Sequence, residues 1–442
     1  MASAEEYEHA PVPPTARKSL PSVAAVWFGF PMNLGNAVFG GVIVYNLGLV
    51  EGLLAILAGN LVLFGYVGAL SHYAGRTGEN FALQAADTFG RRGRIAAAGL
   101  LATVVIGWFS FQVGLTGTTL QDTLGWTPMW GALLGCAVYT LLTVAGIRAL
   151  ALVGAVATPL FVILAAVAIG YGTGHTSPSD ALTYQGTGGT LGFGGAVAIV
   201  IAGFADSGTM TADFTRWSRS GRSAVVATAF AFPFANFVAY ALGGVVVAIG
   251  GSADPAADGG GFLPLLTGHG PLLTALAVLF VFVNLGSVAS HCLYNGAVGW
   301  SALTPAKMRP LALGLGLVGL LFALSGVWGH FVDWLNLLGV FVPPIGAVLI
   351  ADQYLRRRGR APVARDYRWG ALGAWAAGAL VAGLAHYLLP GSVDPLFGIV
   401  VAAGVHVLVE RRTTPRHTSA GPAVDAAGTT TVRTATPEKG LT

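Results

Sequence analysis

The most unusual chemistry in this sequence lies where an apolar run meets Asp206, Ser207, Gly208 and Thr209 in direct succession. The run before them, VAIVIAGF, is typical of the first half of a membrane-spanning helix. A carboxylate, a glycine and two hydroxyls are tolerated at membrane depth only where protein or a water-filled cavity surrounds them. Transporters place their binding sites at helix breaks of this kind. We therefore expect Asp206, Ser207 and Gly208 to contact a substrate.

Asp206 is the most informative of these residues. A carboxylate near mid-membrane is costly and needs a partner. It would carry a proton, accept hydrogen bonds from an amino group of the substrate, or neutralise a cation. By contrast, Asp213 and Asp352 are expected near cytoplasmic helix ends, where Arg216 and Arg356 would form interfacial ion pairs with them.

An aromatic ring and an amide share one helical face in the third expected span. Trp108 lies in the middle of VVIGWFSFQVG, and Gln112 follows four residues later. Ring stacking and an orienting amide suit a flat, hydrogen-bonding solute such as a heterocyclic base. Phe204, just before the break, would provide a second aromatic wall. Ordinary helix packing is the alternative for each of these three residues.

Small polar side chains gather in the first and eighth expected spans. Asn33 and Asn36 follow Pro31, which has no backbone donor, in a glycine-rich segment. The eighth span, FVNLGSVASHCLYNG, holds Asn284 and Ser287 at helical spacing. Hard cations prefer oxygen ligands, so these two pairs form a possible sodium site between the spans, and Asn33 is also expected to contact the substrate. Interhelical packing of small polar residues is the alternative.

Composition identifies the class of protein. The chain has 442 residues and only 10% charged residues, whereas soluble globular proteins carry about 25%. Its mean hydropathy is +0.70, and its repeated apolar runs predict an all-α polytopic membrane protein. The twelve expected spans are 22–48, 50–71, 95–121, 128–147, 149–171, 191–214, 223–250, 271–299, 309–326, 328–352, 367–389 and 393–410.

The basic residues predict an orientation. With twelve spans, all short loops that carry Arg or Lys lie on the side of the two termini, and the opposite loops carry acidic residues. The positive-inside rule then places both termini in the cytoplasm. We expect a cytoplasmic arm at 1–21, a transporter domain at 22–410 and a disordered tail at 411–442, all at the cell membrane. No cleaved signal peptide is expected, and Cys136 and Cys292 fall inside spans, which argues against a disulfide framework.

Two spans look broken in matching places. The first is interrupted near Pro31 and the sixth near Asp206, five spans later. This spacing is the signature of an inverted-repeat transporter, in which the two breaks face each other at mid-membrane. Proline and glycine kinks, which are common in membrane helices, are the alternative.

Several segments together resemble the nucleobase:cation symporter-1 family, and within it the purine–cytosine permease branch. The resemblance runs from about Pro11 to Arg358. The segments that carry it are PVPPTARK, the pair Gly40–Gly41, GWF from Gly107, SGTMTADFTRW from Ser207, the pair Leu293–Tyr294, and PPIGAVLIADQYL from Pro343.

The resemblance implies a leucine-transporter-type fold, with a five-plus-five inverted repeat and two further helices. It implies alternating access and cation-coupled uptake of cytosine or a related nucleobase, with no cofactor beyond a sodium ion or proton as the coupling ion. Trp108 and Phe204 would sandwich the base. The implied sodium region is the backbone around Asn33 and Asn36, with Asn284 and Ser287.

The sequence departs from the cytosine permease pattern in the same elements. Val105 stands where that pattern has a glutamine, and Asp206 where it has a serine. Val288 replaces a hydroxyl expected near sodium, and Ala289 an asparagine expected near the base. Gln112 would restore the lost amide. The changes at Asp206 and Val288 both weaken a sodium site, and the first adds a group that can hold a proton, so cytosine and sodium both stay open.

Other functions fit less well. The sequence has no HExxH motif, Cys/His cluster or phosphate-binding loop, so an enzyme is not expected. The polar residues cluster at one depth, which disfavours a channel. Uptake of a hydantoin, allantoin or thiamine-like ring by the same fold is the main alternative. The expected partners are a small-molecule substrate and the lipid bilayer, with no nucleic acid and no obligate protein partner.

Overall fold

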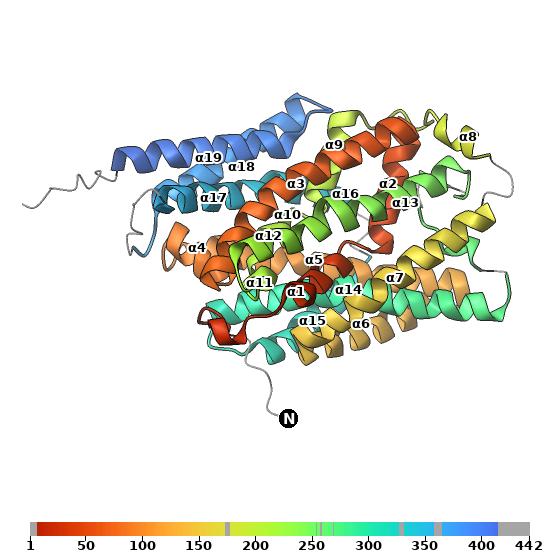
Figure 1. The fold of residues 1–442 in the computed structure, drawn as a ribbon, viewed down its shortest axis with the longest axis horizontal. Helices are drawn as coiled ribbons and strands as arrows, with labels where there is room; N and C mark the ends of the chain where they lie inside the picture. Colours follow the sequence, from red (N-terminus) through yellow and green to blue (C-terminus); the bar gives the residue numbers. More distant parts are fainter. Residues whose placement is uncertain are drawn as a thin grey trace, which may run out of the picture.

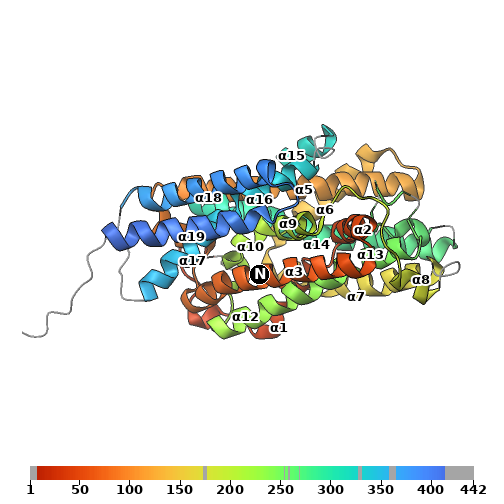
Figure 2. The same ribbon diagram turned by 90° about the horizontal axis from the view of Figure 1, so that it is seen from above.

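The computed structural model of the chain is a bundle of long helices. It describes residues 7–172, 177–252, 254–256, 259–267, 269–326, 331–357 and 365–413, so the tail expected to be disordered lies almost wholly outside it. Within these ranges the structure is helical, and the single β-type contact is a bridge between Lys18 and Ser218. Figures 1 and 2 show the long helices running side by side along an elongated molecule. The predicted all-α class is confirmed.

The described helices follow one another along the chain from α1 to α19. Their bounds are α1 Leu20–Gly29, α2 Leu34–Leu47, α3 Leu49–Thr77, α4 Phe81–Phe89, α5 Arg94–Leu124, α6 Pro128–Ala145, α7 Ile147–Gly172, α8 Pro178–Leu182, α9 Phe193–Ala202, α10 Ala205–Thr209, α11 Ala212–Thr215, α12 Gly221–Ala229, α13 Asn236–Ala248, α14 Pro271–Leu303, α15 Met308–Leu324, α16 Phe331–Phe341, α17 Pro343–Arg357, α18 Trp369–Leu388 and α19 Asp394–Thr413.

The helices are those of a multi-pass membrane protein. Among the described residues, eight helices or helix pairs are long and apolar enough to cross a membrane, and the bent pair α1–α2 makes a ninth. The other three expected spans coincide with α9 to α11, with α15 and with α19.

The two predicted breaks face each other. α1 ends at Gly29 and α2 begins at Leu34, with a bend of 56° between them. After α9, two short helices, α10 and α11, carry the sixth span onward. Phe30 in the first break meets Phe204 in the second, with ring centroids 5.4 Å apart. The prediction that the breaks lie together is confirmed.

Two further spans, expected to be continuous, are interrupted at prolines. A π-helical turn at Phe230–Ala235 contains Pro233 and separates α12 from α13. α16 ends at Phe341, and α17 starts at Pro343. Proline lacks a backbone N–H and clashes with the preceding turn, which accounts for both interruptions.

α2 and α13 pack backbone against backbone. A Cβ on Gly40 would lie 2.6 Å from the Cα of Tyr240, and a Cβ on Gly243 would lie 2.6 Å from the Cα of Ala37. Both distances are far below van der Waals contact. Glycine is therefore required at both positions, and it brings the two helices into direct main-chain contact.

The N-terminal arm is packed against the bundle from residue 7 onward. The Val12 N–H donates to the Gly78 carbonyl at 2.8 Å, which attaches the arm to the end of α3. The Lys18 N–H donates to the Trp217 carbonyl at 2.7 Å, just after α11. The arm therefore ties together the ends of the second and sixth spans.

Asp352 forms an ion pair with Arg368, a residue that the sequence did not suggest, and its expected pairing with Arg356 stays a prediction. Arg368 Nη2 lies 2.8 Å from Asp352 Oδ1 and 2.8 Å from Glu410 Oε1. Asp352 is only 3% exposed, so this network is buried, and it joins α17, α18 and α19. The side chain of Arg356 lies outside the described residues.

Asp213 serves as a helix cap. Its Oδ1 accepts a hydrogen bond from the Phe81 N–H at 3.0 Å, at the first turn of α4. Arg216 donates through Nε to the Asp213 carbonyl oxygen at 3.3 Å. The carboxylate thus satisfies a free N–H at the start of α4, where negative charge is favourable.

Candidate substrate-binding site

A closed cavity lies between the two breaks, α5 and α14. About 10 Å³ of space remains inside it, which is room for about one water molecule. A larger groove of about 990 Å³ lies between α16 and α18, but none of the predicted site residues lines it. The cavity is lined by Phe30, Asn33, Asn36, Trp108, Gln112, Gly203, Phe204, Ser207, Val288 and Cys292.

α5 brings Trp108 and Gln112 to the cavity together, as their four-residue spacing predicts. The Trp108 ring packs edge-on against Phe111, with centroids 6.3 Å apart. Gln112 is 1% exposed, and neither of its amide atoms has a hydrogen-bond partner among the described residues. A buried polar group left unpaired costs about 1–3 kcal/mol. This amide is therefore placed to bind a polar ligand in the cavity.

The second break contributes Phe204 and Ser207 to the cavity, whereas Asp206 and Gly208 are not among the lining residues. Asp206 is completely buried, and its Oδ1 accepts from the Ser207 N–H at 2.6 Å. Its Oδ2 has no hydrogen bond of good geometry within the described residues, although the Trp108 indole lies near the carboxylate. A Cβ on Gly208 would lie 2.9 Å from a side chain of α3, so this glycine serves helix packing. Contact between Asp206 and substrate stays a prediction.

Asparagine side chains take up the free backbone groups of the first break. Asn33 Oδ1 accepts from the Asn36 N–H at 3.0 Å and caps α2. Asn36 Nδ2 donates to the Pro31 carbonyl at 2.6 Å and to Asn236 Oδ1 at 3.0 Å. Asn236 donates in turn to Asn60 Oδ1 at 2.9 Å. A chain of amides thus ties the break to α13 and α3.

Asn284 attaches α14 to the same break. Its Nδ2 donates to the Met32 carbonyl at 2.7 Å, and its Oδ1 accepts from the Leu34 N–H at 2.9 Å. Both ends of the amide therefore satisfy backbone groups that the interrupted helix leaves open.

The residues predicted for sodium fit such an ion only in part. The Ser287 hydroxyl is buried and has no hydrogen-bond partner in the described part of the chain. The Asn33 and Asn284 oxygens already accept backbone N–H groups, and Val288 presents an apolar side chain to the cavity. Hard cations favour several oxygen ligands. Among the described residues, no group of three or more His, Cys, Asp or Glu is placed to hold a metal ion.

Four lining residues were not predicted as site residues: Phe30, Gly203, Val288, which the sequence analysis named only as a departure from the permease pattern, and Cys292. Phe30 lies inside the first break, next to Pro31, so the position of the break was a usable signal. Cys292 follows Val288 by four residues on α14, so helical spacing from that position would have found it. Gly203 carries no side chain, and the sequence offers no signal for it.

The four residues that depart from the cytosine permease pattern differ in whether they line the cavity. Val105 and Ala289 are buried but do not line the cavity. Gln112 does line it, so an amide is present near the substrate one turn beyond Trp108 and about two turns beyond Val105. Of the four departures, only Val288 directly changes the cavity wall.

Comparison with known proteins places this geometry in a family. Residues 11–405 match the family described as permease for cytosine/purines, uracil, thiamine, allantoin. The chain belongs to this permease family. The cytosine permeases of Escherichia coli strains K12 and O157:H7 are each 28% identical to it over 358 residues, which covers 81% of this chain and 83% of each relative.

Solved structures show the fold of the permease. Mhp1, a nucleobase-cation-symport-1 family transporter in a closed conformation with bromovinylhydantoin bound, superposes with a TM-score of 0.72 at 21% identity, covering 92% of this chain and 95% of that one. Inward-facing Mhp1 gives a TM-score of 0.67 at 22% identity, with 91% and 93% covered. A Na⁺-coupled sialic acid symporter gives 0.67 at 13% identity, with 92% of each chain covered. The permease has the leucine-transporter-type fold and is a small-molecule transporter, not an enzyme.

Proposed function

We propose that this permease imports a planar heterocycle of the nucleobase type into the cytoplasm by cation-coupled symport and alternating access. Cytosine is the first candidate, because the cytosine permeases match 81% of the chain. The ring would stack between Trp108 and Phe204, which line the same cavity. Asn33, Gln112 and Ser207 line it as well and would bind the polar edge of the ring.

The observation that carries this proposal is the unpaired amide of Gln112. It lies at the cavity between the two aromatic walls, with both its donor and its acceptor free among the described residues. A nucleobase edge presents a donor beside an acceptor and would satisfy both atoms. Because only about 10 Å³ is available in this closed form, the walls have to separate for the ring to enter.

A hydantoin, allantoin or thiamine-like ring is the second candidate. Mhp1, with bromovinylhydantoin bound, shares this fold over 92% of the chain. Ala289 also removes the asparagine that the cytosine permease pattern has near its base. Each of these rings is flat and carries hydrogen-bonding groups at its edge, so the same cavity chemistry applies.

We propose a proton, held by Asp206, as the coupling ion, with sodium as the alternative. Asp206 is completely buried, and its Oδ2 accepts no well-formed hydrogen bond within the described residues. Protonation would remove a charge that is costly inside a membrane. The single unpaired hydroxyl of Ser287 beside the apolar Val288 supports only a sparse sodium site.

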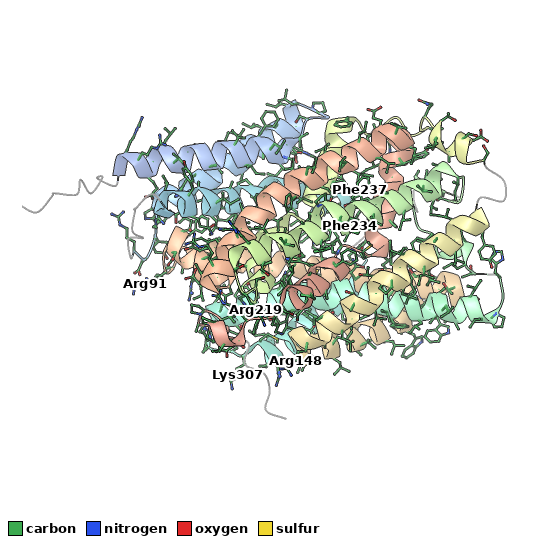
Figure 3. All side chains as sticks on the ribbon, viewed as in Figure 1. Arg91, Arg148, Arg219, Phe234, Phe237 and Lys307 are labelled. Atoms are coloured by element: carbon green, nitrogen blue, oxygen red, sulfur yellow. The ribbon has the colours of Figure 1, made fainter. Side chains whose placement is uncertain are left out.

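We also propose that the end of the bundle that carries the arginines faces the cytoplasm. Figure 3 shows Arg91, Arg148, Arg219 and Lys307 toward one end of the molecule, at the left and lower left of the view. The positive-inside rule places such residues in the cytoplasm, together with both termini, in the cell membrane.

Uptake of radiolabelled cytosine into proteoliposomes tests the proposal, with bases, hydantoins and vitamins as competitors. We expect one class of planar heterocycle to compete strongly. The Gln112→Leu variant should bind that class about tenfold more weakly, since one or two hydrogen bonds are lost, and should melt no lower than the wild type. A protein that transports no member of the panel would refute the assignment. A protein that accepts hydantoins but not cytosine would establish the second candidate.

A further inference from the structure

Two polar side chains on α14 are buried with unpaired atoms beyond the cavity. His291 and Asn295 are both 0% exposed. Neither Nε2 of His291 nor either amide atom of Asn295 has a hydrogen-bond partner among the described residues. Their four-residue spacing puts them on one face of the helix. Asn295 lies beyond the cavity-lining Cys292, toward the end of α14 at Leu303 and the basic end of the bundle.

Elsewhere the protein satisfies its buried asparagines. Asn36, Asn236 and Asn284 all use their amides in interhelical hydrogen bonds. An unpaired buried polar group is destabilising and therefore calls for an explanation. Gln112 faces the cavity and is explained by the substrate there. Asn295 needs a separate explanation, because it does not line the cavity.

Aromatic rings connect the cavity to His291. Phe30 lines the cavity and also stacks on His291, with centroids 4.9 Å apart and planes at 14°. Phe214 packs against His291 at 5.6 Å and stacks on Tyr294 at 6.0 Å. Trp27 stacks on the Phe30 ring at 5.8 Å, and its own Nε1 is buried without a partner among the described residues. The unpaired atoms of Trp27 and His291 therefore belong to rings that pack against Phe30.

We propose that His291 and Asn295 form a second subsite for a planar heterocycle, which the substrate occupies between the cavity and the cytoplasm after Phe30 moves aside. The inference rests on the proposed function, because it assigns the same substrate class to a second position. In the closed form Phe30 covers His291, so the subsite forms only when the basic end of the bundle opens.

The chemistry of the two side chains suits the edge of a nucleobase. Nδ1 of His291 lies against the Ser287 carbonyl, which places the ring proton on Nδ1 and leaves Nε2 as an acceptor. Asn295 adds one donor group and one acceptor. The faces of Phe30 and Phe214 provide stacking surfaces. The subsite therefore favours a flat ring that carries an amino or N–H group beside a carbonyl or ring nitrogen.

Asn295→Leu tests the subsite, with His291→Phe as a second variant. Leucine has a similar size and needs no hydrogen-bond partner, so we expect Asn295→Leu to melt no lower than the wild type. Radiolabelled cytosine, or the heterocycle that the competition assay selects, is the probe. In inside-out vesicles the KM for substrate entering from the cytoplasmic face should rise about tenfold, as for the loss of one or two hydrogen bonds. The Kd of the cavity, measured by calorimetry, and the uptake KM from the outer face should not change.

Asn60→Leu is the matched control, because it makes the same change in an asparagine whose amide is paired with Ile56 and Asn236. It should lower the melting temperature. An unchanged KM from the cytoplasmic face in Asn295→Leu would refute the subsite while leaving the proposed function intact. A lowered melting temperature in Asn295→Leu would assign the residue a structural role instead. If the wild type transports none of the compounds, the proposed function fails, and the subsite fails with it.

Discussion

Asn284 allows a test of whether the first break is held by protein or by a cation. Its amide donates to the Met32 carbonyl at 2.7 Å and accepts from the Leu34 N–H at 2.9 Å. Asn284→Leu keeps the approximate volume of the side chain but leaves both backbone groups buried and unpaired. At about 1–3 kcal/mol for each group, the expected loss of folding free energy is about 2–6 kcal/mol. Against a total stability of about 5–15 kcal/mol this is a severe loss.

The measurement is thermal unfolding in detergent, with and without sodium. Asn284→Leu should melt several degrees below the wild type in the absence of sodium. Ser290→Ala is the control on the same helix, because the Ser290 hydroxyl donates to carbonyls of its own helix, those of Gly286 at 2.6 Å and Ser287 at 3.2 Å. A variant that melts like the wild type without sodium, and that sodium no longer stabilises, would refute this reasoning. Asn284 would then be a sodium ligand.

Three further outcomes are expected. Trp108→Ala should weaken binding of the transported heterocycle by about two- to tenfold beyond the loss of burial, because a stacking face is worth about 0.5–1.5 kcal/mol; an unchanged Kd by calorimetry would make Trp108 a packing residue. Asp206→Asn should abolish uptake driven by a pH gradient in vesicles and leave substrate exchange intact, and wild-type uptake that needs sodium and ignores pH would contradict this. Arg368→Met should cost about 3–5 kcal/mol of folding free energy, because it removes the guanidinium that pairs with the buried Asp352 and the half-buried Glu410. A melting temperature equal to that of the wild type would show that Arg368 contributes nothing to stability.

The sequence predicts the parts of the fold that membrane physics constrains most strongly. Asp206 and Pro31 interrupt apolar spans in a way that lipid does not tolerate, so the two breaks and their proximity could be inferred. Trp108 and Gln112 are four residues apart, so they share a helical face wherever the helix begins or ends. The structure places both on the cavity. These predictions follow from helical spacing and from the cost of burying polar groups, and neither requires knowledge of the tertiary structure.

Other features depend on neighbours that the sequence does not reveal. Pro343 interrupts its span, yet Pro159 lies inside the continuous helix α7. A proline alone therefore does not decide whether a membrane-spanning helix is interrupted. Proximity in sequence suggests Arg356 as a partner of Asp352, whereas the pairing with Arg368, 16 residues away, could be found only from the fold. The direction of the Asp206 side chain depends on how the chain turns after α9, which no periodic pattern describes.

The glycine contacts between α2 and α13 also determine where this protein bends. Because the two backbones touch at Gly40 and Gly243, neither helix slides or rotates without the other, and they behave as one rigid body. The break before α2 is held instead by hydrogen bonds of the side-chain amides of Asn33, Asn36 and Asn284. The pivot of this rigid body is therefore the break itself, at the wall of the cavity. A ring bound at the break would rotate the α2–α13 pair about that point. The atoms of the pair that lie farthest from the break would then move the most.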